Sequence, residues 1–237
     1  MESTIRTRLA NVCQRIETAA RHAGRHASEI QLIVVTKNRP VEQIRELLAC
    51  GPYCLGENRV QEVLEKIPQL PPDTVWHLIG HLQRNKAKQA VRHFALLHSL
   101  DSERLAEALQ RAAEADQGST GTLPVKQCRA VETLIEVNVS GEESKFGLAP
   151  EAVEPLLATI VRSFDRLHVG GLMTMAPYVT DPELARPCFR GLRQLRDRLV
   201  SQGYSLPHLS MGMTNDFEVA IAEGATMVRI GTAIFEG

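Results

Sequence analysis

The feature that most constrains the fold of this chain is a repeated order: a short apolar run rich in β-branched residues, then a segment with helical periodicity. Reading the sequence for period and for Gly and Pro punctuation gives eight such units. The eight predicted strands are residues 30–36, 53–56, 75–80, 94–100, 133–140, 167–177, 206–212 and 226–235. Strands that alternate with helices pair in parallel through crossover helices, so the sequence predicts an α/β fold.

Eight units in a chain of 237 residues are what a (β/α)8 barrel requires. An open, doubly wound sheet remains an alternative, because the count of units tolerates an error of one. Ile5, Leu9, Val12 and Ile16 have the spacing of one buried helical face ahead of the first strand. No break in composition marks a second domain. We therefore predict that residues 1–237 form a single (β/α)8 TIM barrel with an extra N-terminal helix.

Composition excludes several classes of protein. The 27 Lys and Arg residues balance 28 Asp and Glu residues, whereas a nucleic-acid-binding protein usually carries a basic excess. No apolar run approaches the roughly 20 residues of a membrane-spanning helix. The N-terminus lacks the apolar core of a secretory signal, and Glu2 and Glu17 argue against a mitochondrial presequence. We expect no nucleic-acid partner and no membrane.

Cysteine usage points to a reducing compartment. The five cysteines are odd in number and scattered, without the spacing of a disulfide framework or a zinc site; they are Cys13, Cys50, Cys54, Cys128 and Cys188. We expect a cytoplasmic protein. Residues 117–130 are rich in Gly, Ser, Thr and Pro, and we expect them to form a surface loop.

Lys37 directly follows the first apolar run, at the end of the barrel where active sites lie. Strand alternation puts it on the same face as Ile33 and Val35. If this face points inward, a partly dry cavity would favour the neutral amine, which can attack a carbonyl carbon and form a Schiff base. The alternative is a lysine that leaves the strand for solvent.

Residues 208–218, HLSMGMTNDFE, contain a second informative pattern. The predicted strand ends at a glycine, and Thr214 is placed to cap the following helix, with Asp216 and Glu218 in the first turn. The free amides at such a helix start bind anions, while ordinary capping explains the same pattern without a ligand.

Residues 228–235, VRIGTAIF, add to this anion site. Gly231 allows close backbone approach, Thr232 offers a hydroxyl, and barrels commonly bind a phosphate with the loops after strands seven and eight. By alternation Arg229 points inward, where its guanidinium needs a carboxylate or a ligand atom as acceptor.

Together, a Schiff-base lysine, a phosphate site and an inward arginine indicate pyridoxal phosphate. The aldehyde would take Lys37 and the ring nitrogen would take Arg229. An arginine beside that nitrogen keeps it unprotonated, which weakens the ring as an electron sink.

Several long motifs occur in one order along nearly the whole chain. They are VVTKNRP (34–40), GENRVQE (56–62), WHLIGHLQRNKAK (76–88), VNVSGEESKFGL (137–148), GLMTMAP (171–177) and SMGMTNDFEVAIAEGATMVRIGTAIF (210–235). In these motifs the chain resembles the pyridoxal phosphate homeostasis protein family, which has the barrel fold of the N-terminal domain of alanine racemase.

The resemblance implies roles for particular residues. Lys37 would carry the cofactor covalently as an internal aldimine, and Arg229 would face the pyridine nitrogen. The residues implied to contact the phosphate are Ser210, Gly212, Gly231 and Thr232. Asn58 and Met173 would line the pocket.

The chain departs modestly from the family pattern. Thr214 and Asn215 replace a usual Ser-Asp pair, which preserves a cap but removes a carboxylate. His81 replaces a common proline, and the chain ends in FEG. None of these changes touches Lys37 or Arg229.

The favoured function is intracellular pyridoxal phosphate homeostasis, that is storage, buffering or delivery, without catalytic turnover. Apo-enzymes that need the cofactor are candidate recipients. The chain has no room for the β-domain that makes the main dimer contact of alanine racemases, so we expect a monomer.

Two other functions are weighed against homeostasis. A cofactor-dependent amino-acid racemase needs a second acid or base opposite Lys37; of Tyr53, Tyr178 and Tyr204, Tyr178 is the best placed. A class I aldolase-like barrel would use Lys37 and bind a phosphorylated sugar, but the detailed motif match disfavours it.

Other patterns carry no function. The basic residues in 83–94 fit a solvated helix face. The histidines of the third and fourth units are expected to be scattered, without forming a metal site; they are His77, His81, His93 and His98. No nucleotide-binding glycine motif of the P-loop or Rossmann type occurs.

Overall fold

The computed structural model describes residues 4–116 and 130–236. In chain order the helices and strands are α1 (Ile5–His22), β1 (Gln31–Val35), α2 (Val41–Leu48), β2 (Cys54–Glu57), α3 (Val60–Lys66), β3 (Trp76–Leu78), α4 (Ala87–His93), β4 (Leu96–Leu100), α5 (Glu103–Ala115), β5 (Val131–Glu136), α6 (Val153–Ser163), β6 (Leu167–Met173), α7 (Arg186–Ser201), β7 (His208–Ser210), α8 (Phe217–Ala222), β8 (Met227–Ile230) and α9 (Thr232–Phe235). None of the helices in these ranges has the length and apolar character needed to cross a bilayer. The predicted loop at 117–130, with Cys128, lies outside the described residues except for Ala130.

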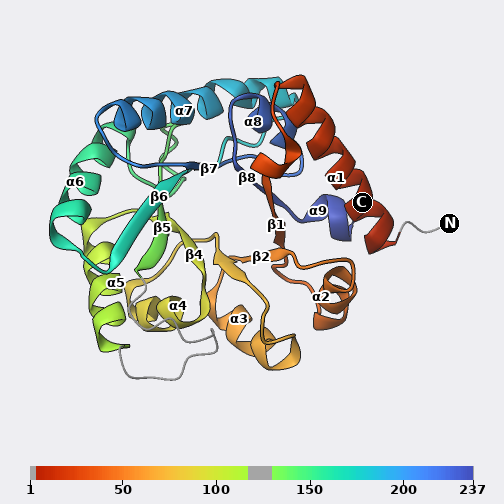
Figure 1. Ribbon diagram of the computed structural model, residues 1–237, viewed down its shortest axis with the longest axis horizontal. Coiled ribbons are helices and arrows are strands. Elements are labelled where there is room, and N and C mark those ends of the chain that lie inside the picture. The colour runs from red at the N-terminus through yellow and green to blue at the C-terminus, as the bar shows by residue number, and fades with distance from the viewer. Residues whose placement is uncertain (1–3, 117–129, 237) are drawn as a thin grey trace.

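The eight strands close into one parallel barrel in chain order, with β8 paired to β1 (Figure 1). Across the closing pair Ile33 lies beside Arg229 and Val34 beside Ile230. The predicted (β/α)8 TIM barrel is confirmed, and the open-sheet alternative is wrong. Closure brings the carboxyl ends of β7, β8, β1 and β2 together on one rim, which positions the site described below.

The strands bury both faces, which explains why their sequences read as nearly continuous apolar runs. One core fills the barrel interior and consists of Ile33, Ile79, Leu96, Leu134, Met173 and Met227. A second, larger core lies between the strands and the helices and includes Val34, Leu55 and Leu78. The inward direction predicted for Ile33 and Val35 is confirmed, since both belong to or pack against the interior core.

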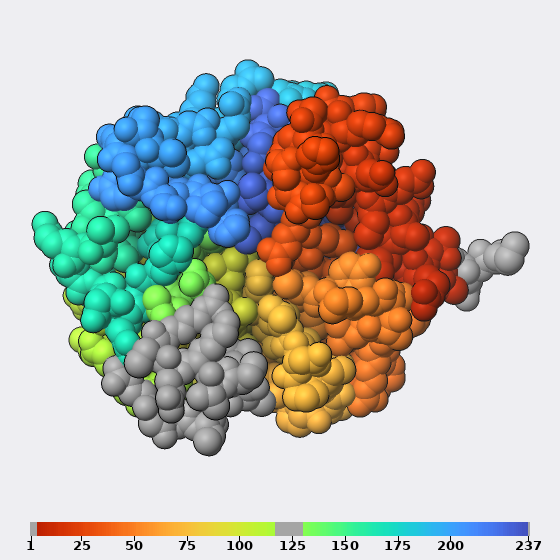
Figure 2. Space-filling view, viewed as in Figure 1, coloured from red at the N-terminus to blue at the C-terminus, as the bar shows by residue number. Residues whose placement is uncertain are grey.

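Helix α1 is the predicted extra N-terminal helix. Its buried face contains Ile5, Leu9, Val12 and Ile16, as expected, and packs against α8 and α9. Thr4 caps it by accepting a hydrogen bond from the backbone N–H of Thr7. In Figure 2 the red N-terminal segment lies against the dark blue C-terminal segment, so α1 covers the barrel where the two ends of the chain meet.

The prediction of a single strand over residues 226–235 is wrong. Strand β8 ends at Ile230, and the short helix α9 begins after Gly231. The carbonyl of Gly231 accepts hydrogen bonds from the backbone N–H groups of Ile234 and Phe235 at 2.9 and 3.1 Å. Both side chains are buried, so packing overrides the strand-like composition of this segment.

Candidate cofactor site at the carboxyl ends of the strands

The eight residues predicted to contact a cofactor lie on one rim of the barrel. They sit at or just beyond the carboxyl ends of five neighbouring strands, β6, β7, β8, β1 and β2, and are Met173, Ser210, Gly212, Arg229, Gly231, Thr232, Lys37 and Asn58. Lys37 and Thr232 are 195 positions apart in the sequence, yet they follow β1 and β8, which pair directly with each other.

Lys37 lies in a turn just beyond β1. The backbone N–H of Arg39 donates to the carbonyl of Thr36 at 3.1 Å, and Asn38 has a positive φ of 57°. Asparagine tolerates this left-handed conformation better than most residues. The turn releases Lys37 from the strand, and the residue is exposed. Of the two alternatives left open by the sequence, the structure thus favours a lysine that leaves the strand for solvent.

A buried ion pair between Lys66 and Glu57 holds the start of this turn. Lys66 Nζ lies 2.6 Å from Glu57 Oε1 and donates to the carbonyl oxygen of Thr36 at 2.9 Å. The Thr36 hydroxyl donates to the same Glu57 oxygen at 2.7 Å. Burial raises the pKa of Glu57, and its bonds to Lys66 and Thr36 act in the opposite direction. This ion pair was not predicted from the sequence, although Lys66 comes only nine residues after Glu57, the last residue of β2.

Arg229 points into the barrel, as predicted, and is 3% exposed. Its Nη1 donates to Ser210 Oγ at 2.6 Å and its Nη2 donates to the carbonyl of Thr174 at 2.9 Å. The acceptors are thus a hydroxyl and a backbone carbonyl, whereas we expected a carboxylate or a ligand atom. Burial lowers the pKa of Arg229 to about 10, and the negative charges of Glu136 and Asp216 oppose this shift.

Two buried histidines continue this network across the interior. His98 Nδ1 lies 2.9 Å from Ser210 Oγ, and His98 Nε2 lies 3.1 Å from His77 Nδ1. Burial lowers the pKa of His77 to about 4. Burial also lowers the pKa of His98, and the neighbouring His77 ring and Arg229 guanidinium add to this shift. The expectation of scattered histidines is wrong for this pair.

Glu136 is a further inward polar residue, at the end of β5. It is 3% exposed, and its Oε2 has no hydrogen-bond partner within the described residues. Burial raises its pKa to about 7; the charge of Asp101 adds to the shift and Arg229 opposes it. Alternation with Leu134, which lies in the interior core, is the sequence signal that identifies Glu136 as inward-facing.

The backbone approaches closely at two glycines. A Cβ at Gly231 would lie 2.9 Å from the carbonyl oxygen of Val35. Gly212 has φ of 93°, and a Cβ there would lie 2.6 Å from Ala220 Cβ. Thr232 is exposed at the start of α9. These three residues form the β7–β8 side of the rim.

The predicted helix cap after β7 is a different residue. Helix α8 starts at Phe217 with Asp216 as its N-cap, so the assignment of Thr214 is wrong. The Asp216 carboxylate accepts a hydrogen bond from the backbone N–H of Met213 at 2.6 Å, which uses its charge to close the loop. Glu218 lies in the first turn, as predicted.

The two remaining predicted residues border this rim. Met173 ends β6 and is fully buried in the interior core. Asn58 follows β2 and is half-buried; its backbone lies so close to Gly80 that a Cβ there would approach the Asn58 carbonyl oxygen to 2.5 Å.

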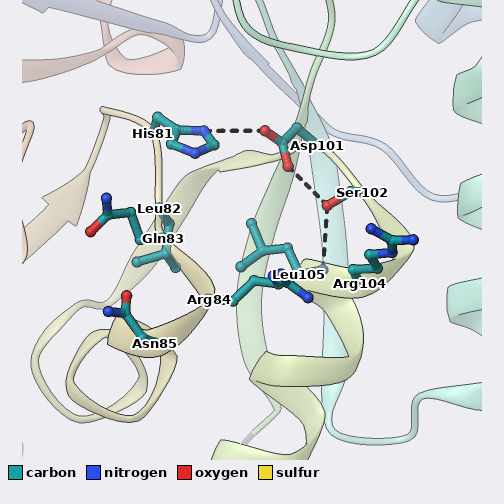
Figure 3. A pocket seen from close by; sticks show the side chains of 9 residues that line it. All are labelled: His81, Leu82, Gln83, Arg84, Asn85, Asp101, Ser102, Arg104 and Leu105. Carbon is teal, nitrogen blue, oxygen red and sulfur yellow. Dashed lines mark hydrogen bonds and ion pairs between the residues drawn. The ribbon is translucent and has the colours of Figure 1, made fainter.

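A cavity of about 770 Å³ opens beyond the carboxyl ends of the next two strands, β3 and β4, between the loop after β3 and the start of α5. Figure 3 shows His81 pointing at Asp101, with Nδ1 and Oδ2 3.2 Å apart, and Asp101 joined to the capping residue Ser102. His81 also stacks on Phe146 with ring centroids 4.4 Å apart. None of the eight predicted cofactor residues lines this cavity.

Known proteins resemble this chain over nearly its whole length. The family model described as "Alanine racemase, N-terminal domain" matches residues 8–237. A pyridoxal phosphate homeostasis protein of Aquifex aeolicus is 46% identical over 230 residues, which cover 96% of each chain.

Solved structures agree with this match. PipY of Synechococcus elongatus, solved with pyridoxal phosphate bound, is 34% identical with a TM-score of 0.80, and the match covers 98% of this chain and 100% of PipY. An alanine racemase of Clostridium difficile is only 14% identical, with a TM-score of 0.71; the match covers 99% of this chain and 56% of the racemase, and it shows the fold alone. The chain therefore belongs to the alanine racemase N-terminal domain family and, within it, to the pyridoxal phosphate homeostasis proteins.

Proposed function

We propose that this protein holds pyridoxal 5'-phosphate through Lys37 and acts in the storage, buffering or delivery of that cofactor, without catalytic turnover. The proposal treats residues 1–237 as a single cofactor-binding domain. The observation that carries it is the meeting of an exposed lysine, a close backbone turn at Gly231 and a buried Arg229 on the paired strands β1 and β8. The cofactor bound to PipY supports it.

The donors on this rim fit the polar groups of the cofactor. When bound, pyridoxal phosphate supplies an aldehyde and an electron-withdrawing ring. Lys37 offers the amine for a Schiff base to the aldehyde. We assign Gly212, Gly231 and Thr232 to the phosphate, because the chain turns into α9 at Gly231 and the first two amides of this helix, at Thr232 and Ala233, precede its first internal hydrogen bond. Asn58 and Met173 border the pocket in this assignment.

We assign Arg229 to the ring nitrogen. With a pKa of about 10, its guanidinium stays positively charged at neutral pH. A positive charge beside the nitrogen disfavours its protonation, which weakens the withdrawal of electrons that catalysis on this cofactor uses. This supports binding without turnover. The family resemblance implied that Ser210 contacts the phosphate, but its Oγ accepts from Arg229 Nη1 at 2.6 Å, so we group it with Arg229 on the ring side.

A racemase function has less support. It requires a second acid or base opposite Lys37, and Tyr178 is the best candidate from the sequence. Tyr178 is 83% exposed in the segment after β6, and no hydrogen bond to another described residue fixes its hydroxyl.

We also propose a cytoplasmic monomer whose recipients are apo-enzymes that require the cofactor. The cysteines within the described residues support a reducing compartment, because all are free; they are Cys13, Cys50, Cys54 and Cys188.

The test is the visible absorption spectrum of the cofactor-loaded protein, followed by borohydride reduction and peptide mapping. We expect a reducible band that maps to Lys37 and is lost in Lys37→Ala. The matched control is Lys88→Ala, since Lys88 is an exposed lysine on α4, away from the rim; it should keep the band.

The absence of a reducible band in loaded wild-type protein would refute the proposal. A band that persists in Lys37→Ala would assign the link to another lysine. Amino acids added to the loaded protein then test for turnover, and steady product formation would favour the racemase.

A further inference from the structure

The barrel interior holds a continuous chain of polar side chains from four different strands. It runs from His77 on β3 through His98 on β4 and Ser210 on β7 to Arg229 on β8, with successive polar atoms 3.1, 2.9 and 2.6 Å apart. All four residues are at most 5% exposed. Buried polar groups in such a chain need every donor and acceptor matched, which restricts where the hydrogens can lie.

Arg229 fixes the direction of the first bond. A guanidinium can only donate, so Ser210 Oγ accepts from Arg229 Nη1. The other end of Arg229 is fixed by the carbonyl of Thr174, whose own hydroxyl donates to the carbonyl of Val137 at 2.7 Å. Ser210 is therefore one of two fixed points that set the plane of the guanidinium.

The Ser210 hydroxyl hydrogen then has two possible destinations. Within the described residues Ser210 Oγ has only Arg229 and His98 as side-chain partners. If His98 Nδ1 accepts that hydrogen, His98 carries its own hydrogen on Nε2 and donates it to His77 Nδ1. Each of these atoms is then satisfied without any ligand. If Ser210 instead donates to a ligand atom, both histidine bonds must reverse, and the hydrogens of His98 and His77 move to Nδ1.

Burial keeps both histidines neutral at physiological pH, since the pKa of His77 is about 4 and that of His98 also lies well below 6.5. Each ring therefore has one donor and one acceptor nitrogen, and its tautomer reports the direction of the chain. The charged group near His98 is Arg229, and the titratable groups near it are the imidazole rings of His77 and His208.

We propose that Ser210, held by His98 and His77, is a positioning residue that fixes the Arg229 guanidinium toward the ring nitrogen of the cofactor, and that it makes no contact with the phosphate. The ligand part of this inference rests on the proposed function; the direction of the chain does not. Both histidines carry their hydrogen on Nε2, with and without the cofactor.

The direct test is the two-bond ¹H–¹⁵N correlation spectrum of the full chain with ¹⁵N-labelled histidine rings, with His98→Gln used for assignment. We expect His77 and His98 to be Nε2–H tautomers in the ligand-free protein and to stay so after pyridoxal phosphate is added. Nδ1–H tautomers in the ligand-free protein would overturn the proposed direction. A reversal on loading would make Ser210 a phosphate contact and overturn the proposal.

A second test compares two ligands that differ only in the phosphate. Because Ser210 acts on the ring side, Ser210→Ala should weaken pyridoxal phosphate and pyridoxal by the same factor, on the order of tenfold for one lost hydrogen bond to a charged group. Thr232→Val, on the phosphate side, should weaken pyridoxal phosphate alone. A selective loss of pyridoxal phosphate binding in Ser210→Ala would refute the positioning role.

The two proposals fail in different ways. If wild-type protein bound neither ligand, the proposed function would fail, while the tautomers of the ligand-free protein would still decide the direction of the chain. If Ser210→Ala does not fold, the spectra of the wild-type protein decide the question without any variant.

Discussion

At the scale of single residues, the motifs locate Lys37, Arg229 and the glycines, whereas the interior polar side chains escape sequence reasoning. Lys37 comes shortly before a proline and Gly231 is itself a glycine, and such residues signal the end of a strand, so the local sequence identifies both positions. His98 and Glu136 carry no such mark, because their partners come from other strands and their environment exists only once the barrel has closed.

Glu136 gives a prediction for the pH dependence of stability. Burial raises its pKa from 4.5 to about 7, so the folded state binds a proton more tightly than the unfolded chain. Stability therefore falls as pH rises from about 4.5 to about 7, by up to about 3 kcal/mol from this group. Glu136→Gln removes the titration. We expect the variant to equal wild type near pH 4 and to exceed it by about that amount at pH 8, measured by urea denaturation.

Parallel pH profiles for the two proteins would show that Glu136 is ionised or solvated in the folded state. Glu132→Gln is the control, because it makes the same chemical change, Glu to Gln, near the other end of β5.

Gly212 gives a second prediction. A methyl group there meets the Phe217 Cα at 2.9 Å and the Ala220 Cβ at 2.6 Å, on a backbone with φ of 93°. We expect Gly212→Ala to destabilise the fold by about 2–4 kcal/mol, the sum of left-handed backbone strain and overpacking. Gly203→Ala is the matched control: φ is 99°, with nothing within 4 Å of the added Cβ. It should cost only the backbone part, about 1–2 kcal/mol. Equal losses in chemical denaturation would mean that α8 shifts to make room.

At the scale of elements, strand and helix types were predicted well, and the errors fall where packing overrides local preference. The segment 232–235 has β-branched and aromatic residues, yet it forms α9 because Gly231 turns the chain and α1 covers Ile234. Likewise the helix after β7 begins later than predicted, with Asp216 in place of Thr214 at its N-cap, and the Asp216 carboxylate accepts from the backbone N–H of Met213.

The junction of β1, β2 and α3 gives a prediction about the turn that carries Lys37. Lys66→Met leaves Glu57 buried without its ion-pair partner, and we expect a loss of about 3–5 kcal/mol in the free energy of unfolding. The double variant Glu57→Leu/Lys66→Met removes both charges and should recover most of that loss. Thermal and urea denaturation measure both effects.

The exposed pair Arg111–Glu107 on α5 provides the comparison, because its side chains are 71% and 46% exposed. Arg111→Ala should change stability by less than about 0.5 kcal/mol. If Lys66→Met were equally mild, Glu57 would have to be protonated or hydrated in the folded protein.

At the scale of the whole molecule, the number of strand–helix units could not decide between a closed barrel and an open sheet. Eight units are compatible with an open sheet until β8 pairs with β1 in a defined register, with Ile33 beside Arg229. Closure also removes every sheet edge from the described barrel, and edges are the commonest route to association of β-structure.

We therefore expect the purified protein to have the mass of one chain in light scattering across a wide range of concentration. Most of the large apolar side chains exposed within the described residues come from separate segments, and only Tyr178 and Leu184 share one, after β6; the others are Val75, Phe146, Val161 and Val200. A mass of two chains would contradict this expectation, and Tyr178→Lys and Leu184→Lys would then test whether the segment after β6 forms the interface.

The position of Lys37 on a turn outside the barrel wall bears on how a carried molecule leaves. Its amine faces solvent, while the strands behind it are closed and fully packed. If the proposed link to Lys37 forms, a second amine can reach the linked carbon without any strand moving. Release would then be a transfer between amines, whose rate follows the concentration of the acceptor and not the viscosity of the medium. In such a carrier the barrel is a fixed holder, and the timing of release lies with the acceptor.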